Sequence, residues 1–240
     1  MHWALINGSP RGKRGNTVIL LGHLARGLAE TGHSTEVVHL ALPRGQATAK
    51  EQFRRAERIV LAFPLYTDAM PGQVMELVES LEEFCGRAEN PPIAFLVQSG
   101  FPEAGQCRAV EHWLELFAKR LGARHLGTIV KGGVEGIQAM PQWMTRRLFR
   151  RIEALGRSLG STGRFDPNAL RELAGPDFTS RWRIPFLKLG MRIGATPYWN
   201  RLLKGNGAFA RRFDRPFEST VDSDALAASS PTQPVGQRAV

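Results

Sequence analysis

The sequence predicts an α/β fold: a doubly wound parallel sheet of five strands, with helices on both faces and a basic, aromatic-rich C-terminal appendage. Two observations lead to this prediction. Over residues 1–159, five short apolar runs alternate with segments of helical periodicity, and such alternation is typical of parallel sheets covered by helices. Beyond residue 140, positive charge and aromatic side chains accumulate without a matching strand pattern.

The expected strands are residues 3–6, 35–40, 59–63, 93–97 and 125–130. The run 59–63 lacks polar alternation, which indicates a strand buried on both faces. The expected helices are residues 17–30, 51–58, 71–84, 106–121 and 141–159. Helix 17–30 has apolar residues at helical spacing, whereas helix 51–58 is short and charged and has the weakest periodicity.

Three regions follow from this pattern. Residues 1–160 form the predicted sheet domain, and residues 161–217 form a helical or irregular appendage. We expect the appendage to be ordered, because so many aromatic side chains are unlikely to stay in water: Phe178, Trp182, Phe186, Tyr198, Trp199, Phe209 and Phe213. Residues 218–240 are rich in Ala, Ser, Pro and Gln and predict a disordered tail.

The net charge of +10 is unevenly distributed. Residues 1–140 hold 15 Lys or Arg and 14 Asp or Glu, whereas residues 141–217 hold 16 and 5. Three interpretations of this basic region compete: solvated arginines on a packed appendage, a cap over the active site or a neighbouring copy, and a surface for anionic membrane. We expect an ordered appendage that helps to shape the active site or the oligomer, with membrane contact as the lesser alternative. No nucleic-acid recognition motif accompanies the charge, so nucleic acid is not an expected partner.

A glycine-rich loop, residues 7–17, follows the first expected strand and opens the first expected helix. A helix N-terminus presents unpaired N–H groups and the positive end of the helix dipole. The loop contains three glycines, Gly8, Gly12 and Gly15, and three side-chain hydrogen-bond donors, Ser9, Asn16 and Thr17. Its three cations are Arg11, Lys13 and Arg14. This combination predicts a phosphate site.

The spacing of the glycines excludes two common phosphate loops. Gly8, Gly12 and Gly15 do not fit the dinucleotide fingerprint G-x-G-x-x-G. A P-loop needs Ser or Thr after its lysine, whereas Arg14 follows Lys13 here. A plain glycine-rich turn with a solvated basic tip is the remaining alternative. The position after a strand, where doubly wound folds bind ligands, favours a phosphate site.

Three segments of the sequence together resemble the flavodoxin-like NADPH-dependent FMN reductases. The first is Gly8-Ser9-Pro10-Arg11 followed by Gly15-Asn16-Thr17, which is similar to the phosphate loop of that family. The second is Pro64-Leu65-Tyr66-Thr67-Asp68-Ala69-Met70-Pro71-Gly72, after the third expected strand, and the third is Ser99-Gly100-Phe101, after the fourth. The resemblance covers roughly residues 1–160.

The resemblance implies a flavodoxin-like fold with FMN as cofactor and NAD(P)H as co-substrate. It assigns the FMN phosphate to Ser9, Arg11, Asn16 and Thr17. It assigns one border of the isoalloxazine ring to Pro64, Leu65, Tyr66 and Thr67, and the other side to Ser99, Gly100 and Phe101. No protein residue is expected to act as nucleophile or base, because the flavin carries the hydride. Two cysteines far apart in sequence predict neither an iron–sulfur cluster nor another metal site.

The resemblance further implies an oxidoreductase that passes hydride through the flavin to a quinone, nitroaromatic, azo or flavin acceptor. Relatives of this kind lead us to expect a cytoplasmic homodimer or homotetramer, and the basic C-terminal region adds peripheral contact with the inner face of the membrane as an alternative. One alternative is a flavodoxin-like electron carrier, against which the near-neutral first 140 residues argue. The other is a non-enzymatic flavin-binding protein whose basic end binds a polyanion.

Overall fold

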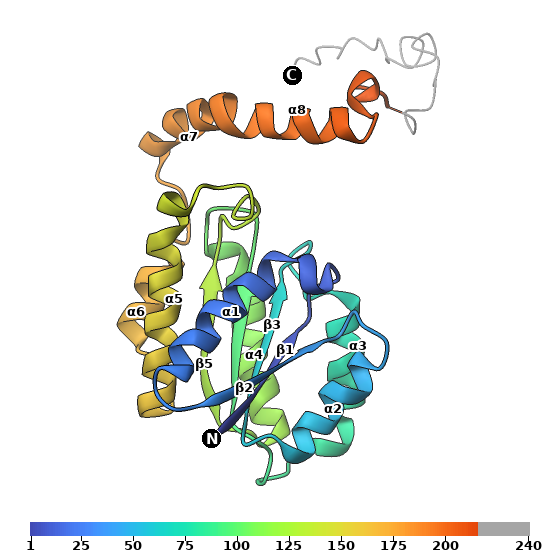
Figure 1. Cartoon of the computed structure of the whole chain (residues 1–240), viewed down its shortest axis with the longest axis vertical. Coiled ribbons are helices and arrows are strands. Elements are labelled where there is room, and N and C mark those ends of the chain that lie inside the picture. The colour runs from blue at the N-terminus through green and yellow to red at the C-terminus, as the bar shows by residue number, and fades with distance from the viewer. Residues whose placement is uncertain (216–240) are drawn as a thin grey trace, which may run out of the picture. The chain divides into compact units, whose positions relative to one another are not determined.

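The computed structural model describes residues 1–215 and confirms the predicted sheet. Its five parallel strands lie in the order β2-β1-β3-β4-β5 (Figure 1). Their bounds are β1 (His2–Asn7), β2 (Ser34–His39), β3 (Arg58–Pro64), β4 (Ile93–Gln98) and β5 (His125–Lys131). The order reverses between β1 and β3, and ligands bind at such a switch point in open α/β sheets.

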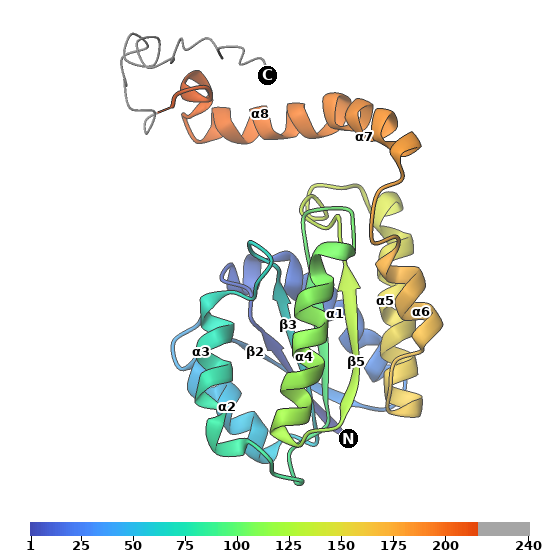
Figure 2. The ribbon, with the colours of Figure 1, turned by 180° about the vertical axis from the view of Figure 1, so that it is seen from behind.

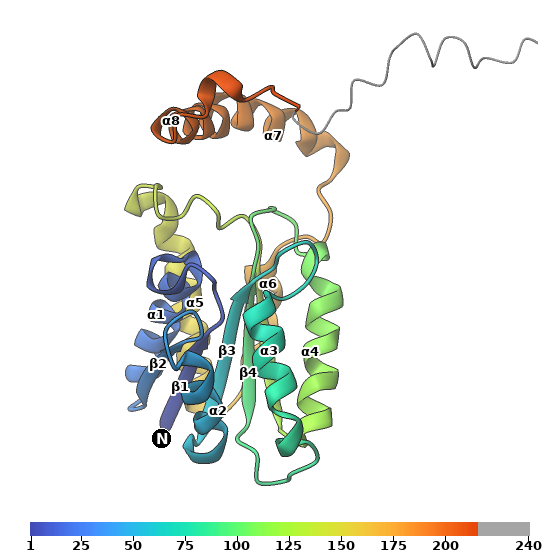
Figure 3. The same cartoon turned by 90° about the vertical axis from the view of Figure 1, so that its right-hand side faces the viewer.

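Helices cover both faces of the sheet (Figure 3). One face carries α1 (Asn16–Ala29) and α5 (Gln142–Thr162), and the other carries α2 (Gly45–Arg55), α3 (Gly72–Ser80) and α4 (Arg108–Leu121). Because successive side chains of a strand point to opposite faces, neighbouring residues enter different cores. On β3, Val60 packs in the core beneath α1 and α5, whereas Leu61 packs in the core beneath α2, α3 and α4.

The helix expected at residues 51–58 was wrong in its bounds. Helix α2 begins at Gly45 and ends at Arg55, and β3 has begun by Arg58. In a sequence, a glycine usually indicates that a helix is interrupted, but here Gly45 is the first residue of the helix. A Cβ at position 45 would lie 2.2 Å from the His39 carbonyl oxygen, so only glycine allows this close approach. Short 3-10 turns lie near the other helices: η1 (Gly12–Arg14), η2 (Glu82–Phe84) and η3 (Gly105–Cys107).

A further helix, α6 (Pro167–Ala174), packs against the sheet beyond α5 (Figure 2). The Asp166 carboxylate caps it by accepting hydrogen bonds from the Asn168 and Ala169 backbone N–H groups at 2.7 and 2.9 Å. Leu173 lies buried in the core beneath α5. The chain divides into a first unit, Met1–Thr179, and a second unit that begins at Ser180. Residues 161–179 of the expected appendage therefore lie in the first unit.

The second unit is helical throughout most of its described part. It contains η4 (Arg181–Arg183), α7 (Ile184–Gly190), a π-helical turn η5 (Met191–Ala195), α8 (Thr196–Gly205) and η6 (Phe209–Arg211). None of these elements has a buried residue. No helix within residues 1–215 is both long and apolar enough to cross a membrane. The predicted tail, residues 218–240, lies outside the described residues.

Candidate functional site

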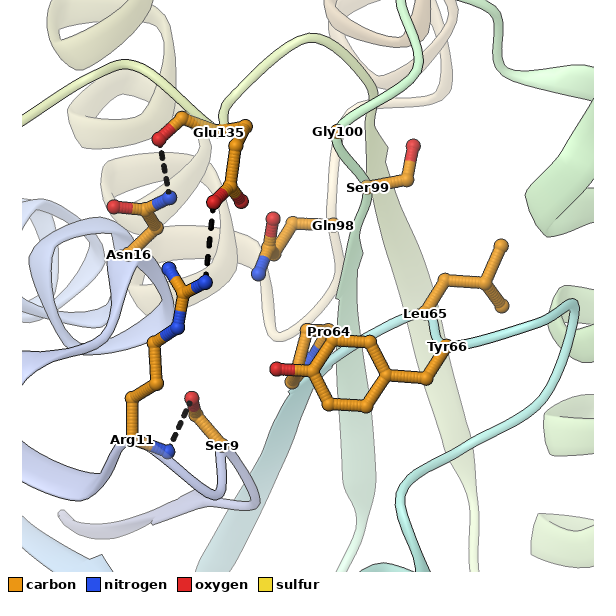
Figure 4. A pocket seen from close by; sticks show the side chains of 10 residues that line it. All are labelled: Ser9, Arg11, Asn16, Pro64, Leu65, Tyr66, Gln98, Ser99, Gly100 and Glu135. Carbon is orange, nitrogen blue, oxygen red and sulfur yellow. Dashed lines mark hydrogen bonds and ion pairs between the residues drawn. The ribbon is translucent and has the colours of Figure 1, made fainter. Parts of the chain in front are cut away.

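Parallel strands deliver their following loops to one edge of the sheet, and a polar pocket lies at that edge (Figure 4). The loops after β1, β3, β4 and β5 all contribute to it. Its lining residues are Ser9, Arg11, Asn16, Pro64, Leu65, Tyr66, Gln98, Ser99, Gly100 and Glu135. The pocket therefore brings together eight of the eleven residues predicted to bind the cofactor.

Asn7 organises the loop that follows β1. Its side chain is fully buried; Oδ1 accepts a hydrogen bond from the Ser9 N–H at 3.0 Å, and Nδ2 donates to the Gly12 carbonyl at 3.0 Å. Asn7 Nδ2 also lies 2.9 Å from His39 Nδ1. Burial, together with the nearby Lys13 charge, lowers the pKa of His39, which favours the neutral ring that can accept this hydrogen bond. The turn also needs Gly12, whose φ is +54°.

Ser9 and Arg11 face the pocket from this loop. The Ser9 hydroxyl accepts a hydrogen bond from the Arg11 N–H at 3.3 Å, and the Arg11 guanidinium donates to the Glu135 carboxylate at 3.1 Å. A Cβ on Gly15 would lie 2.6 Å from the Ser9 hydroxyl oxygen, so glycine is required beside Ser9. Helix α1 follows with no side-chain N-cap, which leaves its first N–H groups available for an anion.

The predicted phosphate residues Asn16 and Thr17 have protein partners in this structure. Asn16 Nδ2 donates to the carbonyls of Val134 at 2.8 Å and Glu135 at 3.1 Å, and so ties the loop after β5 to the start of α1. Thr17 is fully buried and lies outside the pocket lining. Its hydroxyl oxygen lies 3.4 Å from Gln98 Nε2. Both residues thus support the walls of the pocket, and their backbone N–H groups lie at the helix start.

A tight turn after β3 places Tyr66. The backbone N–H groups of Tyr66 and Ala69 donate to each other's carbonyls at 2.9 and 3.0 Å. Thr67 and Asp68, between them, adopt left-handed φ values of 48° and 60°. The Tyr66 ring is 44% exposed and turns toward the pocket, with Pro64 behind it. The structure therefore places Tyr66 in the site, whereas Thr67 occupies the turn and not the lining.

The loop after β4 forms the facing wall. Ser99 is buried, and its hydroxyl donates to the Phe101 carbonyl at 3.2 Å. Gly100 follows in the pocket lining, whereas the Phe101 side chain is largely exposed and lies outside it. The Ser99 N–H donates to the Lys131 carbonyl at 3.0 Å, which fixes this wall against β5.

Two residues that line the pocket, Gln98 and Glu135, were not among the residues predicted to bind the cofactor. Gln98 is the single polar residue of β4, and its amide points into the pocket. A polar residue that ends an apolar run was a usable signal for it. Glu135 follows β5 in a loop held by Asn16 and gave no such signal. In addition, Gln138 Nε2 donates to Asn16 Oδ1 at 2.8 Å, so this loop is fixed from both ends of the Asn16 side chain.

The pocket has the chemistry that FMN requires. Hydrogen-bond donors and the Arg11 cation lie at the start of α1, where a phosphate is stabilised. A half-exposed aromatic ring and backbone-lined walls lie at the other end, where a flat ring system can stack. Within residues 1–215 no cluster of His, Cys, Asp or Glu could hold a metal ion. The residues at this sheet edge therefore fit a phosphorylated aromatic cofactor.

Comparison with known protein families also indicates an FMN-binding protein. The model of the family described as NADPH-dependent FMN reductase matches residues 1–133. No curated protein matches the chain. Among solved structures, an NAD(P)H:quinone oxidoreductase from Methanothermobacter marburgensis is similar with a TM-score of 0.54 and 18% identity, over 66% of this chain and 96% of the other.

Two further solved structures share the fold. General stress protein 14 from Treponema denticola, in complex with FMN, has a TM-score of 0.50 and 17% identity over 66% of this chain and 98% of the other. An NADH:FMN oxidoreductase in its apo form has a TM-score of 0.50 and 20% identity over 73% and 96%. With the family match covering more than half of its length, the chain belongs to the NADPH-dependent FMN reductases and is a flavodoxin-like oxidoreductase that uses FMN with NAD(P)H.

Proposed function

We propose that this protein transfers hydride from NAD(P)H through FMN to a small-molecule acceptor, of the quinone, nitroaromatic, azo or free flavin class. One observation carries the proposal: the anion-binding start of α1 and the half-exposed Tyr66 ring face the same pocket. A quinone is the first acceptor to test, because an oxidoreductase of the same fold is described as acting on quinone.

The proposed FMN contacts combine the pocket lining with three residues that adjoin it in sequence, Thr17, Thr67 and Phe101. Ser9, Arg11 and the backbone N–H groups at Asn16 and Thr17 would hold the phosphate. Pro64, Leu65, Tyr66 and Thr67 would border one side of the isoalloxazine, and Ser99, Gly100 and Phe101 would close the other. Gln98 joins this set because its amide points into the same space.

FMN supplies the hydride chemistry when it is bound, so this chain need not provide a nucleophile or a general base. The task of the protein residues is to position the ring and to shield it. The turn from Tyr66 to Ala69 is braced by two backbone hydrogen bonds, at 2.9 and 3.0 Å. This turn would hold the Tyr66 ring in place while nicotinamide and acceptor bind in succession.

We also propose that the enzyme is a cytoplasmic homodimer or homotetramer. The half-exposed Tyr66 and the largely exposed Phe101 support the assembly, because a neighbouring copy would cover these two apolar side chains. Sedimentation of the FMN-loaded protein tests the assembly state. The visible absorption spectrum of the purified protein tests the cofactor, and NADPH oxidation with a quinone tests the reaction. Protein that never shows flavin absorption after incubation with FMN would contradict the proposal.

Initial rates are expected to give parallel lines when NADPH and quinone are both varied. The reason is that nicotinamide and acceptor would use the same face beside Tyr66 in turn, so the first product leaves before the second substrate binds. The measurement is a matrix of initial rates in double-reciprocal form. Lines that intersect would instead indicate a ternary complex and two separate binding places.

Replacing Tyr66 with Asp is expected to lower kcat/KM for the acceptor by about tenfold, because stacking on an aromatic side chain contributes about 1–3 kcal/mol. FMN affinity should change less than it does when the phosphate loop is altered. Tyr66→Phe is the matched control, since it keeps the ring and should keep near-normal kinetics. Equal kinetics in the Asp variant and the wild type would remove Tyr66 from the acceptor site.

A further inference from the structure

The second unit presents an apolar face along α7 and the π-helical turn. Its most regular row is Trp182, Phe186, Leu189 and Ile193, at intervals of four, three and four residues. Such intervals place side chains on one side of a helix. These four side chains are between 55% and 70% exposed. Trp199 on α8 and Phe213 beyond η6 are more than half exposed as well.

Positive charge accompanies this apolar face. Residues 180–215 contain nine Lys or Arg and one acidic residue, Asp214. Arg181, Lys188 and Arg192, at intervals of seven and four, form a basic row along the same helix. None of these three has an acidic partner within residues 1–215, whereas Asp214 accepts a hydrogen bond from Arg211 at 2.7 Å. The basic row is therefore not neutralised within residues 1–215.

Within residues 180–215 the unit has no buried residue, so this apolar face is not covered by its own described helices. Its aromatic contacts are local, such as Trp182 with Phe186 at 6.4 Å between ring centroids, and Arg212 over the Phe209 ring at 4.0 Å. A helix gains most of its stability by burying an apolar face, and exposed apolar patches of this kind mark sites of protein or membrane contact. The unit therefore needs a cover that accepts both apolar side chains and cations.

We propose that this cover is the surface of an anionic lipid bilayer. A second copy of the unit would bring two strongly basic surfaces together, which is unfavourable. Nucleic acid would neutralise the cations but leave the row from Trp182 to Ile193 in water. An anionic bilayer offers acyl chains to that row and phosphate groups to Arg181, Lys188 and Arg192. A helix of this composition lies in the interface plane, with tryptophan and phenylalanine at the headgroup boundary.

The test measures binding of the full-length, FMN-loaded protein to phosphatidylcholine vesicles with and without phosphatidylglycerol, by flotation. Binding is expected only when phosphatidylglycerol is present. Each Lys or Arg near an anionic surface contributes about a fivefold factor in affinity, so replacing Arg181, Lys188 and Arg192 together with Gln should weaken binding by about 100-fold. Phe186→Ser with Ile193→Ser, which leaves the charge unchanged, should also abolish flotation.

A charge-matched control lies on the first unit. Lys119, Arg120 and Arg124 are exposed and have no acidic partner among residues 1–215, so their replacement with Gln should leave vesicle binding and the folded structure unchanged. Three results would overturn the proposal: binding that does not depend on phosphatidylglycerol, equal losses in the control and the Arg181 set, or flotation that survives in the Phe186 and Ile193 variant. If the protein instead forms a dimer in the absence of lipid, and Phe186→Ser with Ile193→Ser dissociates that dimer, the apolar face would be assigned to contact with a second copy.

Discussion

Replacing Ser9 with Asp is expected to abolish FMN binding at concentrations that saturate the wild-type protein. Ser9 is 2% exposed and lines the pocket beside the Arg11 N–H. A carboxylate there would face the phosphate, and two charges about 4 Å apart interact by about 4 kcal/mol at an effective dielectric constant of about 20. Loss of the hydroxyl donor to a charged group costs about 1.5–3 kcal/mol more. The affinity should therefore fall at least ~1000-fold.

A smaller substitution at the same position should lower FMN affinity by a smaller factor. Ser9→Ala removes one donor without adding charge, so FMN affinity should fall about tenfold or more. Ser34→Asp is the matched control, because Ser34 begins β2 at the opposite end of the sheet, where its hydroxyl lies 3.0 Å from His2 Nδ1. Quenching of FMN fluorescence measures the affinities, and circular dichroism checks the fold. Wild-type affinity in the Ser9→Ala variant would remove the phosphate from this loop.

The sheet could be predicted from sequence because three of its strands, β1, β3 and β4, are almost continuous apolar runs. A strand that is buried on both faces has apolar residues at successive positions and is therefore easily recognised. Strands β3 and β4 are almost wholly buried. Helix α2 could not be placed in the same way. It begins at Gly45 because the His39 carbonyl leaves no room for a side chain, and that contact joins residues from two different elements.

The pocket was predictable in its loops and less so in its individual side chains. Ser9 and Tyr66 lie where their motifs indicated, since both follow strands that end at the same sheet edge. Thr67 follows β3 and Phe101 follows β4, but they adopt turn and surface positions, because loop geometry decides which neighbour faces inward. Glu135 follows β5 to the same sheet edge, and hydrogen bonds from Asn16, 119 residues away in sequence, hold its loop at the pocket.

Helix packing depends on a further pair of residues that sequence reading passed over. Gly27 on α1 and Gly156 on α5 lie at the closest approach of the two helices. In the sequence each is one glycine within a helical pattern, which is normally a mild weakness of about 1 kcal/mol relative to alanine. The reason that glycine is needed at both positions is apparent only in the structure, where the backbone of the other helix leaves no room for a side chain.

Gly27→Ala is accordingly expected to destabilise the protein, against the helix propensities. A Cβ at position 27 would lie 2.1 Å from the Glu153 carbonyl oxygen and 2.9 Å from the Arg157 backbone nitrogen. Backbone atoms cannot move aside as a flexible side chain can, so α1 and α5 must separate. Overpacking of this kind costs about 3 kcal/mol, at the upper end of its usual range. For a chain of this size, that corresponds to a fall in Tm of about 6–12 °C.

Gly22→Ala, in the same helix, should have the opposite sign. No atom lies within 4 Å of a Cβ at position 22, so alanine gains about 0.5–1 kcal/mol by reducing the freedom of the unfolded chain. Urea unfolding of both variants without FMN separates packing from cofactor binding. Because the two substitutions share a helix and a chemistry, a Gly27→Ala variant as stable as Gly22→Ala would mean that α1 and α5 do not pack backbone to backbone at Glu153.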